Sequence, residues 1–305
     1  MAYFWMIVCV ITCTVQSPFK KIYQNQTKKG TFLFTALIQF VAACFFGGAC
    51  LVEGGFAFEW GALPYSLLFA VATSTCCITS VLALRYGSLA LTSLISSYSL
   101  MLPTMYGFFR FHDPVYITQL IGIALLLVSL YLTNMTKKSQ KEGDVPAEKS
   151  HFSMKWLVLV IVMALTNGMC AIVQKEEQYR FDGAYKNEFM MVALLVSFAV
   201  LTVVGLILER RDIGVVIKKG AIPAVLTGAA NGATNLLVMV VTATIAASIF
   251  FPVISGGGMV LAYILSVTLF KEKFTTGQKI GILLGVVSLV FLNLNLECFK
   301  IGSFA

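Results

Sequence analysis

The chain alternates long apolar runs with short polar segments from one end to the other. An α-helix of about 20 apolar residues crosses a hydrocarbon core of about 30 Å. A chain that crosses this core must satisfy its backbone internally, because no water is present there. The pattern therefore predicts ten membrane-spanning helices, near residues 2–17, 31–52, 63–83, 88–109, 115–134, 155–174, 188–208, 220–241, 245–269 and 277–296.

The longest polar segment divides these helices into two groups of five. Residues 133–153 are rich in Lys, Ser and Glu and contain a proline, which is typical of a solvated linker. We therefore predict three parts: a first five-helix repeat over residues 1–134, a cytoplasmic linker over 135–153 and a second five-helix repeat over 154–305.

The second half repeats part of the first. Residues 111–134 match residues 270–293 at a fixed offset, and ten of the twenty-four positions are identical. The identical pairs include polar ones: Gln119/Gln278, Gly122/Gly281, Ser129/Ser288 and Asn134/Asn293. An odd number of spans in each half makes the second half enter from the opposite face, as in many secondary transporters. The predicted fold is thus an all-α integral membrane protein with two inverted-topology five-helix repeats.

The charged residues agree with this span count. Only 12% of residues are charged, against about a quarter in soluble proteins. When loops are assigned to alternating faces, most Lys and Arg fall on one face, and the exceptions are Arg110, Lys175, Arg180, Lys186 and Lys300. The positive-inside rule makes the basic face cytoplasmic, so both termini are predicted outside a cell membrane. The net charge of +8 then reflects topology, and we expect no nucleic-acid partner.

No motif for catalysis or metal binding is found. The sequence lacks H-E-x-x-H, G-x-S-x-G and P-loop patterns, and its eight cysteines lack the C-x₂-C spacing of a metal site. We therefore expect neither an enzyme nor a bound metal or cofactor. A membrane enzyme and a channel remain the alternatives to a carrier, although a channel would call for charged rings or a filter loop.

Together these features resemble the drug/metabolite transporter superfamily, in particular its ten-helix EamA-like branch. The second half carries the resemblance best, through Pro252, Glu272, Gly277, Gln278 and Gly281. The first half departs from it with His112-Asp113-Pro114 in place of the usual glutamate. The resemblance implies a solute carrier, often an exporter of metabolites or drugs, that works by alternating access about a central cavity.

Polar residues inside the predicted spans are candidates for lining that cavity, because they are costly in lipid. Asn231 and Asn235 lie four residues apart and so share a helix face. The glycines of residues 256–258 either allow close helix packing or expose backbone to a ligand, and the tyrosines either pack or close over a solute. The predicted substrate-binding residues are Asn231, Asn235, Ser96, Ser97, Tyr98, Ser255, Gly256, Gly257, Tyr263 and Asn167.

The acidic residues bear on the mechanism. None lies at the centre of a predicted span, and Glu177 and Glu188 are expected in an outer loop. This disfavours proton coupling through a buried acid and favours exchange of a neutral or zwitterionic solute. Glu272 either pairs with a nearby Lys or Arg as a gate or caps the helix that follows it. The predicted function is that of a secondary transporter of a small polar or zwitterionic metabolite or drug, an exporter or exchanger that acts as a monomer or homodimer.

Overall fold

The structure is a computed structural model, and it is mainly α-helical. It describes residues 2–100, 102–103, 106, 110, 115–118, 121–122, 124–125, 128–129, 132, 154–182, 184–242, 247–272, 274–293 and 300–302. Within these ranges five segments are long and apolar enough to cross a membrane, namely Thr31–Val52, Trp60–Tyr86, Met154–Phe181, Lys186–Leu208 and Arg210–Val238. The chain is therefore a helical, membrane-embedded protein. The predicted linker over residues 135–153 lies outside the described residues.

The helices of the two halves follow one another in a similar order. The first half provides α1 (Ala2–Gln26), α2 (Thr31–Val52), the 3₁₀ turn η1 (Trp60–Ala62), α3 (Leu63–Tyr86), α4 (Leu89–Ser97) and the 3₁₀ turn η2 (Tyr98–Leu100). The second half provides α7 (Met154–Phe181), α8 (Lys186–Leu208), the 3₁₀ turn η4 (Arg210–Asp212), α9 (Ile213–Val215), the π-helical turn η5 (Val216–Gly220), α10 (Ala221–Thr242), α11 (Ala247–Leu269) and α12 (Thr276–Asn293).

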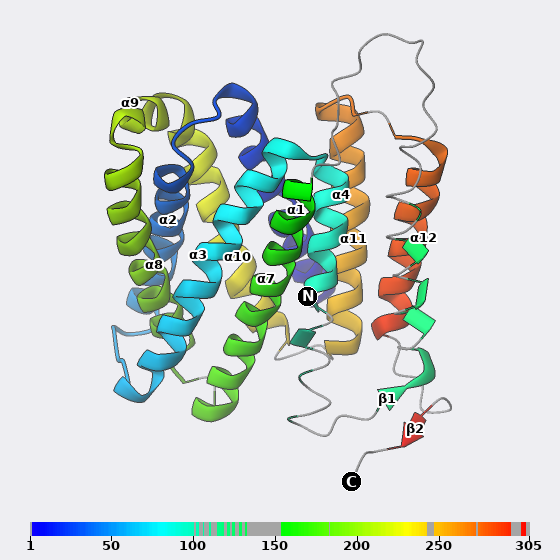
Figure 1. Cartoon of the computed structure of the whole chain (residues 1–305). Helices are drawn as coiled ribbons and strands as arrows, with labels where there is room; N and C mark the ends of the chain where they lie inside the picture. The colour runs from blue at the N-terminus through cyan, green and yellow to red at the C-terminus, as the bar shows by residue number, and fades with distance from the viewer. Residues whose placement is uncertain are drawn as a thin grey trace.

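Helices from the two halves pack against each other throughout the bundle (Figure 1). α2 packs on α8, α3 on α7, α1 on α10 and α4 on α11. α10 also packs on α2, and α3 packs on α8. α12 lies at the edge of the bundle beside α11 (Figure 1). The interior is therefore formed jointly by both halves.

Polar contacts between helix ends define two ends of the bundle. At the first end Glu209, which follows α8, accepts the backbone N–H groups of Thr31 and Phe32 at 2.9 Å and of Leu33 at 3.2 Å, at the start of α2. A carboxylate is favoured there by the unpaired N–H groups of the helix. Burial raises the pKa of Glu209, and the three N–H donors offset part of that rise. We call this the basic end, because Lys28, Arg85 and Arg210 lie in the segments that meet there.

Several predicted helix boundaries are wrong. α1 continues through Pro18 to Gln26, so Lys20 and Lys21 lie in a helix and are buried, not in a loop. α7 continues to Phe181 and includes Glu177. α4 ends at Ser97 and gives way to a 3₁₀ turn. Proline and runs of charge predict helix ends from local preference alone, but here both α1 and α7 continue past them.

The first-half copy of the duplicated segment is only partly described. Among residues 115–134, Val115–Tyr116 form strand β1, which pairs antiparallel with β2 (Lys300–Gly302). A helix beginning at residue 115 is thus not observed, and this short pairing adds to the otherwise helical fold. The described residues from 117 to 132 are helical.

Candidate functional site

A chain of side-chain amides crosses the interior from α1 through α10 to α7. Asn231 Nδ2 donates to Gln16 Oε1 at 3.1 Å, and Asn235 Nδ2 donates to Asn231 Oδ1 at 3.2 Å. Gln174 Nε2 then donates to Asn235 Oδ1 at 3.2 Å. We call Gln16, Asn231, Asn235 and Gln174 the amide chain. The two predicted asparagines are therefore brought together, with one glutamine from each half beside them.

Hydroxyl groups extend the amide chain on the α1 side. Gln16 Nε2 donates to Thr234 Oγ1 at 3.1 Å, and Thr234 Oγ1 donates to Thr12 Oγ1 at the same distance. Amides need partners when water is excluded. Here the partners include side chains that can also bond to a solute, although Asn235 Nδ2 also donates to the backbone oxygen of Asn231 at 2.9 Å and Gln16 Nε2 to that of Thr12 at 3.4 Å. If a ligand replaces one of these side-chain hydrogen bonds with a bond of its own, the amide group still has a partner. The arrangement can therefore bind a neutral polar group at little cost.

A second group of predicted residues lies between α4, η2 and α7. Asn167 Nδ2 donates to Ser99 Oγ at 2.6 Å. The Tyr98 hydroxyl lies 3.1 Å from Ser129 Oγ, which donates to the backbone oxygen of Gly281 at 2.7 Å. Tyr98 is buried in an apolar cluster with Leu94, Trp156 and Met259. None of these bonds joins the amide chain, so the predicted residues whose side chains the structure describes do not form one continuous network.

The remaining predicted residues pack between helices where the structure describes them. A Cβ atom at Gly257 would lie 3.2 Å from Val10 on α1, and one at Gly256 would lie 3.8 Å from Val286 on α12. Tyr263 packs on Phe274. Close packing is the role of residues 256–258 that these contacts support. Ser96 is half-buried, and the side chains of Ser97 and Ser255 lie outside the described part of the structure.

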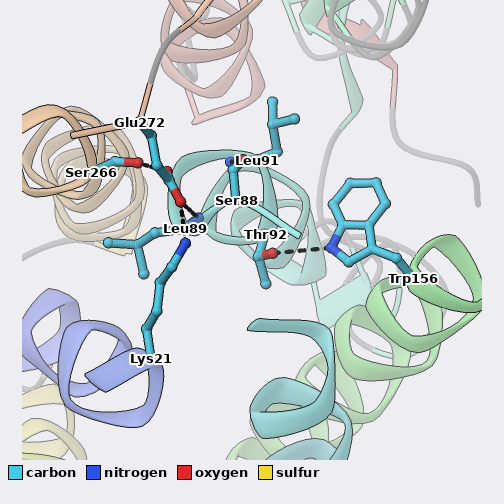
Figure 2. Close-up of polar contacts among 8 residues, drawn as sticks. All are labelled: Lys21, Ser88, Leu89, Leu91, Thr92, Trp156, Ser266 and Glu272. Atoms are coloured by element: carbon cyan, nitrogen blue, oxygen red, sulfur yellow. Dashed lines mark hydrogen bonds and ion pairs between the residues drawn. The ribbon is translucent and has the colours of Figure 1, made fainter. Parts of the chain in front are cut away.

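An ion pair joins three helices at the basic end (Figure 2). Lys21 on α1 pairs with Glu272, which follows α11, and Glu272 also accepts the hydroxyl of Ser266. Glu272 also accepts the Leu89 N–H group, 3.3 Å away at the start of α4. Glu272 therefore pairs with a lysine and also contacts the start of a helix, but this helix differs from the predicted one. Glu272 caps α4 and not α12, whose start is closed by Thr275 and Gln278.

The start of α7 is tied to the same region. Trp156 Nε1 donates to Thr92 Oγ1 at 3.3 Å, and Ser88 caps α4 by accepting the Leu91 N–H group at 3.2 Å (Figure 2). Trp156 lies so close to Gly87 that a Cβ atom there would be 2.0 Å from its ring nitrogen. Glycine is thus required where α3 turns into α4.

Polar contacts also close the other end of the bundle. Asn187 Nδ2 donates to Glu53 Oε2 at 2.7 Å, and Lys186 Nζ lies 3.7 Å from Glu53 Oε1. The Ala57 N–H group donates to Glu188 Oε1 at 3.4 Å. Glu177 and Glu188 lie in helices here and are buried, which corrects the prediction of an outer loop. In the part of the chain that the structure describes, neither carboxylate oxygen of Glu177 has a hydrogen-bond partner.

Sequence reasoning missed three interior residues: Gln16, Lys20 and Glu177. Gln16 and Lys20 fall on one face of α1, together with Thr12 and Gln24, at a spacing of four residues. This spacing was readable in the sequence. The predicted first helix ends near residue 17, where the apolar run ends, so Lys20 and Gln24 fell outside it.

Comparison with known proteins identifies a fold but no family. No family model and no curated protein matches the chain. Among solved structures, 28 chains match. One, described only as "Crystal structure of protein", aligns over 95% of both chains with a TM-score of 0.53 and 14% sequence identity. At this identity the similarity concerns the fold alone.

Proposed function

We propose that this protein is a secondary transporter, an exporter or exchanger that carries a small polar or zwitterionic solute across the cell membrane by alternating access. The observation that carries the proposal is the amide chain. It sets neutral hydrogen-bonding groups from α1, α7 and α10 inside an apolar helical bundle. Polar groups at such positions in membrane helices commonly mark a solute pathway.

The packing of the two halves supports an inverted ten-helix repeat. α1 packs on α10 as α3 packs on α7, and α10 packs on α2 as α3 packs on α8. Suppose that α7, α8, α10 and α11 are the counterparts of α1, α2, α3 and α4. A two-fold rotation that exchanges counterparts then converts the α1–α10 pair into the α7–α3 pair, and the α2–α10 pair into the α8–α3 pair. The α2–α8 and α4–α11 pairs map onto themselves. In this proposal the amide chain lies between the repeats, where inverted-repeat transporters bind their solutes.

The contacts of Glu272 support a gate. Glu272 connects α1, α4 and α11 at the basic end through Lys21, Leu89 and Ser266. Rocking of one repeat against the other requires this connection to open. The state described here is then closed at the basic end, with the amide chain sealed from that side.

Counter-flow in proteoliposomes tests the proposal. A panel of amino acids, nucleosides and sugars is first screened for thermal stabilisation of the purified chain. Each stabilising solute is then loaded inside vesicles, and uptake of its labelled form is followed. We expect saturable, trans-stimulated uptake that falls about tenfold or more in Asn231→Ala and Asn235→Ala, because each loses a hydrogen-bonding group to the solute.

A matched control separates the site from general damage. Asn25→Ala removes the same side chain from an exposed position on α1 and should transport like the unmodified chain. Unchanged uptake in both Asn231→Ala and Asn235→Ala would remove the amide chain from the site. Ion conductance without saturation would indicate a channel.

A further inference from the structure

Lys20 is a buried cation for which the described part of the chain supplies no acid. Its side chain lies between α1 and α3, and the residue is only 8% exposed. The Nζ atom donates to Ser80 Oγ at 3.4 Å, a long bond that uses one of its three protons. None of the salt bridges among the described residues includes Lys20. A buried ammonium with so little compensation is costly.

The adjacent lysine shows the contrast. Lys21 is buried to the same extent, but Glu272 neutralises it and Phe270 lies under it, with Nζ 5.1 Å from the ring centre. Lys21 is thus satisfied by the protein itself. Lys20 points to another face of α1 and keeps its charge uncompensated.

Two more buried polar side chains, on α1 and α10, leave hydrogen-bonding capacity unused. Gln24 follows one helical turn later on α1 and is 2% exposed, and among the described residues neither its Nε2 nor its Oε1 atom has a hydrogen-bond partner. Thr227 on α10 is fully buried, and its hydroxyl has no partner within the same described ranges. Natural proteins pair nearly all buried polar groups, so a group of three such side chains needs an explanation.

The register of α1 and α10 places Lys20 and Thr227 at the same level. These helices are antiparallel, because α1 ends and α10 begins at the basic end. Gln16 meets Asn231 directly. Lys20 lies four residues after Gln16 on α1, and Thr227 lies four residues before Asn231 on α10, so each shares a helix face with that residue. In antiparallel helices both steps lead toward the basic end, which places Lys20 opposite Thr227. The unpartnered groups are therefore continuous with the amide chain.

We infer that Lys20, Gln24 and Thr227 bind the carboxylate of the transported solute. This inference rests on the proposed transport function and narrows its substrate to small carboxylate-bearing metabolites, with α-amino acids as the simplest class. The ammonium, amide N–H and hydroxyl all donate, and a carboxylate accepts from several donors at once. A single positive charge matches one carboxylate, and the amide chain binds the neutral polar part of the same molecule.

Binding to the purified full-length chain in phosphatidylcholine nanodiscs tests the site. The probes are the common α-amino acids and short monocarboxylic acids, each compared with its own primary amide by thermal shift and then by calorimetry. We expect at least one acid to stabilise the protein and its amide to fail. Affinity for that acid should fall roughly ten- to hundredfold in Lys20→Gln, the cost of losing a charged hydrogen bond.

Control variants isolate the role of charge. Lys28→Gln removes the same charge from an exposed position beyond α1 and should bind like the unmodified chain, whereas Lys20→Arg should retain part of the affinity. If Lys20→Gln does not fold, Thr227→Val and the acid–amide comparison on the unmodified chain still decide the question. Equal binding of acid and amide, no binding of any acid, or full affinity in Lys20→Gln would each overturn the inference.

Counter-flow with the acid separates this inference from the transport proposal. Lys20-dependent binding without trans-stimulated uptake would refute transport and leave the carboxylate site in place. Trans-stimulated uptake of a solute whose affinity is unchanged in Lys20→Gln would refute the carboxylate site and leave the transport proposal in place.

Discussion

At the scale of single residues, the buried polar groups fall into two kinds. Most are paired inside the bundle, such as Ser74 and Ser197, whose hydroxyl oxygens lie 2.6 Å apart, and the four members of the amide chain. A smaller set has no partner among the described residues, and Glu177 and Gln24 are the largest side chains in it. The paired groups hold helices together. The unpartnered groups lower the stability of the fold.

Glu177 gives the clearest test of that cost. It is 1% exposed and unpartnered, so replacing it with an apolar side chain of similar length removes a desolvation penalty. We expect Glu177→Met to stabilise the folded protein by about 1–3 kcal/mol, measured as a rise in melting temperature of the purified chain. Glu176→Met is the matched control and should be destabilising, because Glu176 accepts the Tyr106 hydroxyl at 2.7 Å and pairs with Arg110. A lower melting temperature for Glu177→Met would mean that the carboxyl is required by the fold.

The sequence predicted some of these residues and missed others for identifiable reasons. Asn231 and Asn235 were found because an amide inside a long apolar run stands out and the spacing of four places both on one face. Glu177 was missed because the run QKEEQYR has the composition of a loop. Its burial depends on α3 packing beside α7 and on the start of α8, where Phe189 and Met190 share an apolar cluster with Val173 of α7. Local sequence does not reveal these contacts.

At the scale of helices, glycines set the distance between the two halves. Gly228 and Gly232 on α10 both face α2, and a Cβ atom at Gly228 would lie 2.7 Å from the backbone oxygen of Ile38. Small residues at such crossings let membrane helices pack closely. The close α2–α10 contact in turn positions Asn231, which lies between these glycines on the same helix.

A pair of alanine substitutions measures this packing. Gly228→Ala puts a methyl group against backbone that has little freedom to move, so we expect a loss of about 1–3 kcal/mol and a lower melting temperature. Gly48→Ala on α2 places the same methyl group where no atom lies within 4 Å. Because alanine has a higher helix propensity than glycine, Gly48→Ala should leave the stability of the protein unchanged or raise it by up to about 1 kcal/mol. Equal effects of the two substitutions would show that the α2–α10 crossing tolerates a larger spacing.

At the scale of the whole molecule, hydropathy predicted much of the architecture, and long-range contacts determined the rest. The apolar runs at residues 31–52 and 188–208 coincide with α2 and α8, apart from two residues at the start of α8. The boundary errors that involve charged residues occur at α1 and α7, where polar side chains enter the interior. A hydropathy pattern assumes that charge marks the membrane surface, and Lys20, Lys21 and Glu177 do not follow that assumption.

The two ends of the bundle allow a test of its predicted orientation in the membrane. The loop between α1 and α2 carries Lys28 and Lys29, whereas the turn between α7 and α8 includes Ala184 at the opposite end (Figure 1). Because basic loops remain in the cytoplasm, a cysteine at position 28 should react with a charged, membrane-impermeant maleimide only after cells are opened. A cysteine at position 184 should react in intact cells. Native cysteines supply the background, measured on the unmodified chain. Labelling of position 28 in intact cells would reverse the orientation, and labelling of both positions from one side would contradict helices that cross the membrane.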